Sequence, residues 1–399
     1  MIVFWIIFVF TLVFVGLGLL EYYLHRRNLS SLTYRIHVNG TRGKSSVSRL
    51  IAAGLREGGI VTAAKTTGTL ARMIFPDGSE FPVFRPGRTN VIEQVRIAAM
   101  AARSRAQALV IECMALQPHL QSLSERRLVR ATHGVITNAR ADHLDVMGPD
   151  EENVARALAG MTPHQGKLYV GLTRNLDILR EAARDRGVEF ISITQEEADL
   201  LTDEEMEAFP YVEHRENAAL ALRVCADLGV AREVALRGMR KARPDPGAMT
   251  CHEISFFGRR IIFVNAFAAN DPESTEMIWE AARRNFPDVE KNIALFNCRA
   301  DRQDRSRQLG EIVGSWKRVD HVVLMGSGTF IFGKYAAARG FSSSRIVFAE
   351  DQRVDDVFEI LLEQFEKSVL VVGMGNIGGL GLDAVRYFKN RGVLIKMKT

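Results

Sequence analysis

The sequence predicts an α/β protein with an N-terminal transmembrane helix, a domain built on a mainly parallel sheet, and a smaller, Rossmann-like C-terminal domain. Three observations predict this architecture. Residues 1–20 carry no charge and are mostly Ile, Val, Phe and Leu. Beyond them, short apolar runs rich in β-formers alternate with amphipathic stretches, a pattern typical of parallel sheets. A Pro- and Gly-rich break at residues 243–247 divides this alternating region.

Residues 1–20 are long enough to cross a hydrocarbon core of roughly 30 Å as a helix. A cleaved signal peptide, the alternative, would have basic residues before the apolar run and small residues at a cleavage site after it. Here Arg26, Arg27 and Arg35 all follow the run, and no Lys or Arg precedes it. The positive-inside tendency therefore predicts a single-pass anchor over residues 1–28 in the cytoplasmic membrane, with the remaining chain facing the cytoplasm.

The rest of the chain has the length of two domains, which we expect over residues 29–245 and 246–399. Its four cysteines are widely spaced and form no C-x-x-C, so they predict neither a zinc site nor disulfides. A net charge of +5 is compatible with nucleic acid, anionic lipid or an acidic substrate. The basic motifs with interleaved aromatic residues that favour nucleic acid are absent, and we expect no nucleic-acid partner.

Apolar runs give the expected strands, and amphipathic spacing gives the helices between them. In the first domain we expect strands at residues 34–38, 60–64, 108–111, 134–137, 167–170 and 189–193, and helices at 46–57 and 211–228. In the second domain we expect strands at residues 261–265, 292–296, 321–325, 345–348 and 368–372.

The most informative stretch lies between the first expected strand and helix. It has the short G-T-x-G-K-[ST] form of a phosphate-binding loop, although Val38 stands where the longer pattern has glycine. In such a loop, backbone N–H groups and a helix N-terminus hold phosphates, Lys44 reaches the β/γ oxygens and Ser45 can bind Mg²⁺. A Gly-rich turn with a surface lysine is the alternative. We predict ATP binding by Gly40, Thr41, Arg42, Gly43, Lys44, Ser45 and Ser46.

Polar residues also follow three other strands, where ligands of parallel sheets gather. Glu112 ends one strand and is a candidate Mg²⁺ ligand, with a strand-end salt bridge as the alternative. A T-N-A-R-A-D-H-L-D segment from residue 137 brings two carboxylates and His143 into one loop, which is also compatible with a capped turn. Lys65, Thr66 and Thr67 offer a cation and hydroxyls to an anionic substrate, although a polar turn has a similar sequence.

These motifs, in this order, resemble the Mur ligase superfamily, which includes the folylpolyglutamate synthases. The chain more closely resembles the ligase subunit of the poly-γ-glutamate synthases (PgsB/CapB family). The strings that carry this resemblance span the chain: N-G-T-R-G-K-S from residue 39, K-T-T-G-T from 65, E-C-M from 112, D-H-L-D-V-M-G-P from 142, P-D-P-G-A-M from 244, F-A-A-N-D from 267 and N-C-R-A-D-R from 297.

The resemblance implies an ATP-dependent amide ligase that polymerises glutamate. A substrate carboxylate takes the γ-phosphoryl group, the amine of an incoming glutamate attacks the acyl phosphate, and the products are a γ-amide, ADP and phosphate. It implies that Lys44 contacts the phosphates and that Ser45 and Glu112 hold a first Mg²⁺ or Mn²⁺. The implied partners are glutamate, the growing poly-γ-glutamate chain, the membrane and small membrane subunits for synthesis and export.

The resemblance also assigns His143 to a second metal, Asn138 to the nucleotide site and Asn217 to adenine. The sequence departs from the superfamily in two places. No lysine between residues 145 and 166 is available for the carbamylated second-metal ligand. The usual carboxylate that contacts ribose is displaced, so Asp271 is the candidate replacement, with Asn270 beside it as a substrate contact.

An Arg-rich segment follows the expected strand at 292–296. Arg299 and Arg302 are candidates to hold the γ-phosphate or glutamate carboxylates, while a solvated helix start with internal ion pairs is the alternative. A G-x-G-x-x-G string at residues 373–378 lacks the acidic residue and returning strand of a dinucleotide site, so we interpret it as a close strand-to-helix turn.

Two rival functions stay open from the sequence. A ligase with the same mechanism could add another amino acid or extend another acceptor, and a substrate panel would separate it from a glutamate polymerase. A membrane-tethered P-loop ATPase that drives transport or assembly would turn over ATP without an amino acid, and the D-H-L-D segment would then have no evident role.

Overall fold

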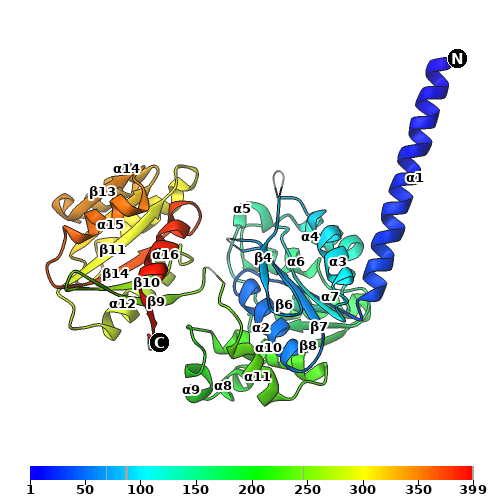
Figure 1. The fold of residues 1–399 in the computed structure, drawn as a ribbon, viewed down its shortest axis with the longest axis horizontal. Coiled ribbons are helices and arrows are strands. Elements are labelled where there is room, and N and C mark those ends of the chain that lie inside the picture. Colours follow the sequence, from blue (N-terminus) through cyan, green and yellow to red (C-terminus); the bar gives the residue numbers. More distant parts are fainter. Residues whose placement is uncertain (69, 86–88, 246, 398–399) are drawn as a thin grey trace. The chain divides into compact units, whose positions relative to one another are not determined.

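The computed structural model describes residues 1–399 except 69, 86–88, 246 and 398–399. The chain forms two compact units, shown in Figure 1. The first comprises Met1–Phe209 and Glu213–Arg243, and the second comprises Pro210–Val212 and Pro244–Thr399. The chain thus passes from the first unit to the second at the Pro- and Gly-rich break.

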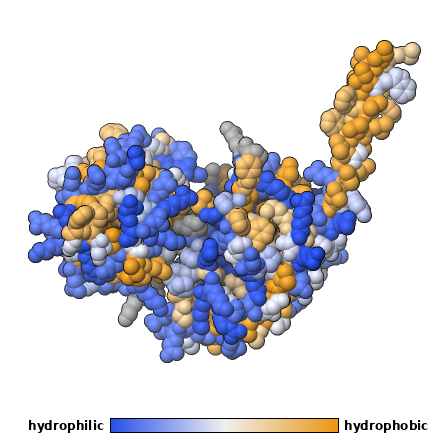
Figure 2. All heavy atoms as spheres, in the orientation of Figure 1, coloured by the Kyte–Doolittle hydropathy of each residue, from blue (hydrophilic) through white to orange (hydrophobic). Residues whose placement is uncertain are grey.

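Helix α1 runs from Ile2 to Ser31 and is the one candidate membrane span among the described residues. Its side chains are exposed and apolar over most of its length, as Figure 2 shows. The last turns differ, because His25 and Leu29 are buried against the first unit. The helix therefore continues three residues past the expected end of the anchor at residue 28, without a flexible joint.

The first unit contains a sheet of eight strands in the order β4-β3-β2-β5-β1-β6-β7-β8. All neighbouring pairs are parallel except β2 with β3 and β3 with β4. Its strands are β1 Tyr34–Asn39, β2 Thr62–Thr66, β3 Arg72–Ile74, β4 Glu80–Pro82, β5 Ala108–Glu112, β6 His133–Ile136, β7 Lys167–Val170 and β8 Glu189–Ser192. Its helices after α1 are α2 Lys44–Glu57, α3 Glu93–Arg103, α4 Pro118–Leu123, the π-helix η1 Ser124–Val129, α5 Leu144–Met147, α6 Glu151–Ala159, α7 Leu176–Arg186, α8 Gln195–Asp199, α9 Asp203–Glu207, α10 Arg215–Asp227 and α11 Arg232–Arg240.

Three adjacent strands, β5, β1 and β6, form the centre of this sheet. The register pairs Val38 with Glu112 and Asn39 with Ile136, so the carboxyl ends of all three strands lie at one edge. The carboxyl-terminal residues of all three strands are buried, as expected for strands covered on both faces. The polar residues that follow them are consequently brought together at that edge.

The second unit contains a sheet of seven strands in the order β13-β12-β11-β14-β10-β9-β15. Strands β13 to β10 in this order are parallel neighbours, whereas β9 pairs antiparallel with β10 and with β15. Its strands are β9 Thr250–Phe256, β10 Arg259–Asn265, β11 Lys291–Cys298, β12 His321–Gly326, β13 Ile346–Glu350, β14 Ser368–Met374 and β15 Val393–Ile395. Its helices are α12 Pro272–Asn285, η2 Ala300–Arg302, α13 Gln303–Val313, α14 Thr329–Ala338, η3 Ser343–Arg345, α15 Val354–Leu362 and α16 Leu380–Arg391.

Two apolar layers cover the faces of the second sheet. One contains Trp279, Phe296 and Phe332, and the other contains Phe263 and Phe388, whose rings stack at 4.0 Å between centroids. All the expected strands exist, with ends shifted by a few residues. The sequence reading missed β3, β4, β9 and β15, which add antiparallel strands to both sheets.

Candidate active site

The phosphate-loop candidate is held in place by the loop that follows β6. Asn138 is central, because its Oδ1 accepts from the Thr41 hydroxyl at 2.6 Å and from the Arg42 N–H at 3.0 Å. The Thr137 hydroxyl donates to the Arg42 carbonyl at 2.5 Å, and the Arg140 N–H donates to the Thr41 hydroxyl at 3.0 Å. The loop after β1 is thus fixed by side chains nearly one hundred positions further along the chain.

Two glycines of the loop are required by close contacts. Gly40 has φ +135°, and a Cβ there would lie 2.0 Å from the Thr137 hydroxyl oxygen. Gly43 has φ +80°, and a Cβ there would lie 2.6 Å from Asn217 Oδ1. A residue with a Cβ would be strained in this backbone conformation and would clash with these neighbours. The Gly-rich sequence therefore permits a loop that lies tightly against β6 and α10.

The start of α2 offers unpaired N–H groups beside this loop. The amides of Gly43, Lys44, Ser45 and Ser46 donate to no acceptor within the described part of the chain. The Lys44 ammonium donates to the carbonyls of Gly40 at 2.7 Å and Thr41 at 3.2 Å. A helix N-terminus with free amides and a nearby ammonium fits a phosphate chain, as the sequence motif predicts.

Ser45 and Glu112 bring oxygen ligands to the same place. The Ser45 hydroxyl donates to Glu112 Oε2 at 2.9 Å, and the Thr67 N–H donates to the same oxygen at 2.7 Å. Glu112 is 2 % exposed, so its carboxylate is fixed from two sides at the sheet edge. A hydroxyl and a carboxylate are hard oxygen donors that suit Mg²⁺ or Mn²⁺, and the pair fits the expected metal.

Lys65 and Thr66 lie in the interior of the first unit. Both are fully buried, and the Lys65 ammonium contacts Glu93 Oε1 at 3.0 Å. Glu93 is also bound by Arg85, through its Nε at 2.5 Å and its Nη2 at 3.1 Å. Burial lowers the pKa of Lys65, opposed by the charge of Glu93. The structure thus shows this lysine in a buried ion pair with Glu93, and its expected contact with a substrate stays a prediction. The Thr67 N–H contacts Glu112.

His143 begins α5 with a left-handed backbone, at φ +48° and ψ +45°. Its Nε2 lies 3.9 Å from Asp142 Oδ1, and its N–H donates to the same oxygen at 3.1 Å. Within the described ranges it makes no hydrogen bond or ion pair with Ser45 or Glu112, and no group of three His, Cys, Asp or Glu side chains could hold a metal. The structure thus brings together Ser45 and Glu112, the candidate ligands of the first metal, but does not bring His143 into contact with them.

Asn217 packs against the phosphate-loop candidate from α10. Its Nδ2 donates to Glu213 Oε1 at 2.9 Å, while its Oδ1 faces Gly43. The side chain is buried and fixed beside the loop by both contacts. The structure therefore places Asn217 beside the phosphate-loop candidate, and its expected contact with adenine stays a prediction.

In the second unit, the carboxyl ends of β11 and β14 are joined by two asparagines. Asn297 Nδ2 donates to the carbonyls of Asn376 at 2.5 Å and Gly378 at 3.0 Å, and Asn376 Nδ2 donates back to the Asn297 carbonyl at 2.9 Å. Arg305 donates to Asn376 Oδ1. The G-x-G-x-x-G string is thus a tight strand-to-helix turn, as expected.

The predicted site residues of the second unit lie at this edge of the sheet. They differ in exposure and in hydrogen-bond partners. Arg299 forms a two-point ion pair with Asp301 at 2.9 and 2.7 Å, which lowers the pKa of Asp301. Arg302 is exposed. Asp271 caps α12 by accepting from the Ser274 N–H at 2.9 Å, and Asn270 is partly exposed just before it. The internal ion pair matches the solvated alternative for Arg299, which leaves its role in substrate binding a prediction.

Sequence reasoning missed several supporting residues. Thr137 was visible only as part of a motif, and nothing local indicates that its hydroxyl holds the Arg42 carbonyl. The ion pairs of Glu93 could not be predicted from the residues around it, because its partners Lys65 and Arg85 come from other parts of the chain. The Asn297 and Asn376 pair follows from the adjacency of β11 and β14, which strand order along the chain does not reveal.

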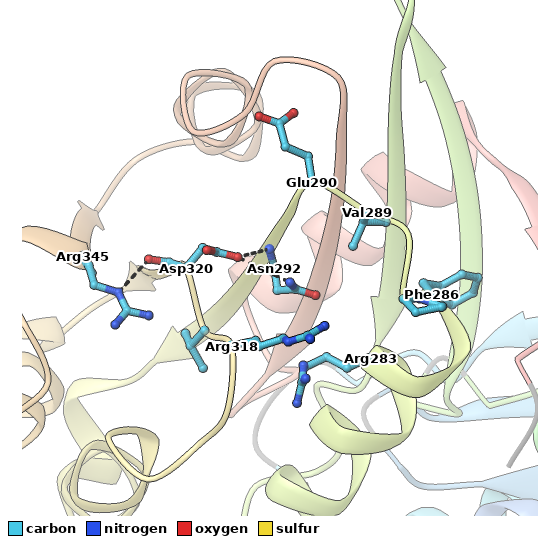
Figure 3. Close-up of a pocket in the computed structure, with 10 residues that line it drawn as sticks. Arg283, Phe286, Val289, Glu290, Asn292, Arg318, Asp320 and Arg345 are labelled. Carbon is cyan, nitrogen blue, oxygen red and sulfur yellow. Dashed lines mark hydrogen bonds between the residues drawn. The ribbon is translucent and has the colours of Figure 1, made fainter.

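A separate hollow in the second unit contains none of the predicted residues. It has a volume of about 240 Å³ and lies at the start of β11 and β12, the edge opposite Asn297. Figure 3 shows Arg283 and Arg318 there, with Asp320 bonded to Asn292 and Arg345. Asp320 Oδ2 accepts from the Asn292 N–H at 2.8 Å, and its carbonyl accepts from Arg345 Nε at 3.0 Å.

Family models match both units. Residues 38–227 match the Mur ligase middle domain, and residues 251–391 match the C-terminal domain of the poly-gamma-glutamate synthase CapB. Solved structures share the fold. MurF from Acinetobacter baumannii has a TM-score of 0.66 at 16% identity, covering 93% of this chain and 80% of that one. A bifunctional folylpolyglutamate synthase/dihydrofolate synthase from Yersinia pestis, complexed with AMPPNP and Mn ion, has a TM-score of 0.66 at 14% identity, covering 92% and 90%.

Curated relatives match over most of the chain. PGA synthase CapB of Bacillus subtilis (strain 168) is 34% identical over 377 residues, covering 94% of this chain and 95% of the relative. Capsule biosynthesis protein CapB of Bacillus anthracis is 36% identical over 375 residues, covering 91% and 78%. The matched family models and these relatives define an ATP-dependent ligase of the Mur type. Within that class, the chain belongs to the CapB family.

Proposed function

We propose that this protein polymerises glutamate into poly-γ-glutamate, forming each γ-amide bond at the expense of ATP. The observation that carries the proposal is the sheet edge at β5, β1 and β6, where the fixed loop, Lys44, Ser45 and Glu112 converge. Phosphoryl transfer depends mainly on positioning and on neutralising charge, and these residues supply both. The names of the CapB relatives support glutamate as the monomer.

The proposed reaction has two steps. A carboxylate oxygen of the acceptor takes the γ-phosphoryl group, which gives an acyl phosphate and ADP. The amine nitrogen of the incoming glutamate then attacks the acyl carbon, the C–O bond to phosphate breaks, and the amine proton passes to solvent. The free amides at the start of α2 and the Lys44 ammonium are positioned to bind the phosphate oxygens during the first step.

Ser45 and Glu112 would hold the divalent cation, Mg²⁺ or Mn²⁺, which when bound neutralises the phosphate oxygens. Glu112 is already fixed by the Thr67 N–H, so it needs little rearrangement to act as a ligand. Arg299 and Arg302 are the proposed contacts for glutamate carboxylates, and Asp271 is the proposed contact for ribose. Asn217 is the proposed contact for adenine.

We further propose that α1 is an uncleaved, single-pass anchor and that the two units lie on the cytoplasmic side. Arg26 and Arg27 follow the apolar stretch, and this charge bias supports the orientation. Small membrane subunits that assist synthesis and export are proposed partners. These assignments support synthesis at the inner membrane face, close to where the polymer leaves the cell.

The test uses membranes that carry the full chain and its partners, supplied with ATP, Mg²⁺ and one amino acid at a time. ADP, AMP and polymer are all quantified. Glutamate-dependent ADP release with a protease-resistant polyanion is expected. ADP release that ignores every amino acid would support the rival ATPase, and dependence on another amino acid would support the rival ligase.

Lys44→Ala is the matched inactive variant, because it removes the ammonium that contacts the loop carbonyls. We expect it to lower the rate about 10²- to 10³-fold without unfolding the protein. Lys334→Ala removes an exposed lysine of α14 and is the control that should keep full activity. Normal polymer from Lys44→Ala would refute the ATP site.

A further inference from the structure

The end of α1 is built into the first unit. Leu29 and Leu32 are 4 % and 0 % exposed and share an apolar cluster with Ile97 and Ala101 of α3 and with Val129 of η1. His25, one turn earlier, is also buried and lies beside the backbone of Arg127 and Leu128. The helix therefore leaves the unit at the position of η1 as one unbroken helix.

Helix geometry sets the distance between this unit and a bilayer. The uncharged stretch from Ile2 to Leu20 spans roughly 29 Å at 1.5 Å per residue, which matches a hydrocarbon core of roughly 30 Å. Glu21, the first charged residue, is then at the hydrocarbon boundary. His25 follows after about 6 Å of helix, which is within the headgroup layer. The backbone of η1 beside His25 lies at the same height.

Exposed arginines lie at this distance from the hydrocarbon core. Arg126 and Arg127 of η1 are both exposed, as is Arg27 of α1, and Arg26 is partly exposed. None of the four forms an ion pair with a described acidic residue. The one acidic residue of η1, Glu125, is buried and accepts from His37 at 2.7 Å and from the Ala131 N–H at 2.8 Å. These arginines are therefore available to anionic groups outside the protein.

We propose that the Arg126 and Arg127 edge of η1 is a second membrane contact, which binds anionic lipid headgroups beside α1. This inference rests on the proposed membrane anchor. Basic residues near an anionic leaflet are attracted to its surface within a Debye length. Two contacts with the membrane, α1 and the basic edge of η1, together fix the tilt and rotation of the first unit. A single helix alone would leave the rotation free.

The test places the full chain in nanodiscs of phosphatidylcholine alone or with anionic phosphatidylglycerol, and follows amide hydrogen exchange of residues 124–131. We expect about tenfold slower exchange in the anionic discs, and loss of the difference at high salt. Arg126→Ala/Arg127→Ala should abolish the difference. Arg126→Lys/Arg127→Lys should retain it, because the attraction depends on charge.

The matched control, Arg284→Ala/Arg339→Ala, removes two exposed arginines of the second unit and should change nothing. Equal exchange in both kinds of disc, or equal protection in the double alanine variant, would overturn the proposal. Glutamate-dependent ADP release measured on the same samples reports separately on the ligase. A chain that does not enter the nanodiscs would refute the anchor and this contact, but not the chemistry.

Discussion

The hydroxyl of Ser45, at the start of α2, donates to Glu112 Oε2 at the end of β5 across 2.9 Å, although the two residues are 67 positions apart. The contact exists because β1 and β5 are parallel neighbours whose carboxyl ends coincide. It joins the phosphate-loop candidate to a buried carboxylate at that edge of the sheet. The charge of Glu112 is consequently the feature whose removal should be most informative.

Glu112→Gln keeps the size of the side chain and an oxygen that can accept from Ser45 and the Thr67 N–H. We expect the Mg²⁺ concentration for half-maximal activity to rise about tenfold or more, because a unit of negative charge is lost from a hard-cation site. A Mg²⁺ titration of ADP release measures this. Glu152→Gln, on the exposed side of α6, is the control. An unchanged titration would remove Glu112 from the metal site.

Asn138→Ala should loosen the loop that Asn138 holds. The variant loses the acceptor for the Thr41 hydroxyl and for the Arg42 N–H, which leaves two donors without partners at a buried place. We expect the ATP KM to rise about tenfold and the free energy of unfolding to fall by about 1–3 kcal/mol. Steady-state kinetics and urea denaturation measure the two effects.

Asn175→Ala provides the comparison for Asn138→Ala, since Asn175 precedes α7 without a capping hydrogen bond from its side chain. A normal ATP KM for Asn138→Ala, in a protein whose stability has fallen, would mean that the loop forms its site without this residue.

Substrate binding by Arg299 can be tested separately from its ion pair with Asp301. The pair with Asp301 is exposed on both sides, so its loss should leave the urea midpoint of unfolding nearly unchanged. If Arg299 binds a substrate carboxylate, Arg299→Ala should raise the glutamate KM about tenfold, whereas Asp301→Asn should not raise it. Glutamate titrations of both variants give the answer. Equal small effects would identify a surface ion pair.

His37 predicts a pH dependence of stability. Burial alone lowers the pKa of His37, but the interactions with Cys113 and Glu125 outweigh it and raise the pKa from 6.5 to about 9. The native state therefore binds this proton more tightly than the unfolded chain does. The resulting stabilisation is complete below pH 6.5 and is lost as the pH rises through about 9.

Urea denaturation across this pH interval measures the effect of His37. In His37→Gln the decline between pH 6.5 and about 9 should be reduced, because the group that releases the proton is gone. A decline of the same size in the variant would assign it to other groups.

Local patterns predicted much of this molecule. The loop at residues 40–46 was recognisable because its glycines, lysine and serine act through nearby backbone, and β7 was predicted with its observed ends. The hairpin of β9 and β10 was missed because Phe257 and Gly258 both adopt positive φ, where Asn-Gly or Asp-Gly is the usual signal. Strands β3 and β4 have only three residues each, too few for a period to appear.

The contacts between the polar segments could not be predicted from local patterns. The sequence gives the order of polar segments but not which strands are neighbours. The sequence around Lys65 resembles a polar loop. In the structure, Lys65 is buried and forms an ion pair with Glu93 on α3. A lysine at the end of a strand can point to either face of the sheet, and only the position of α3 decides between them.

The apolar cluster around Leu29 and Leu32 also determines how this protein can be prepared in water. A polypeptide cut between Glu21 and Leu24 would leave the lipid-facing stretch behind and keep the cluster intact. One that started at β1 would lack both leucines and uncover the apolar side chains of α3 and η1, which would promote aggregation. The shortest well-behaved soluble enzyme should therefore retain the last two to three turns of its own anchor.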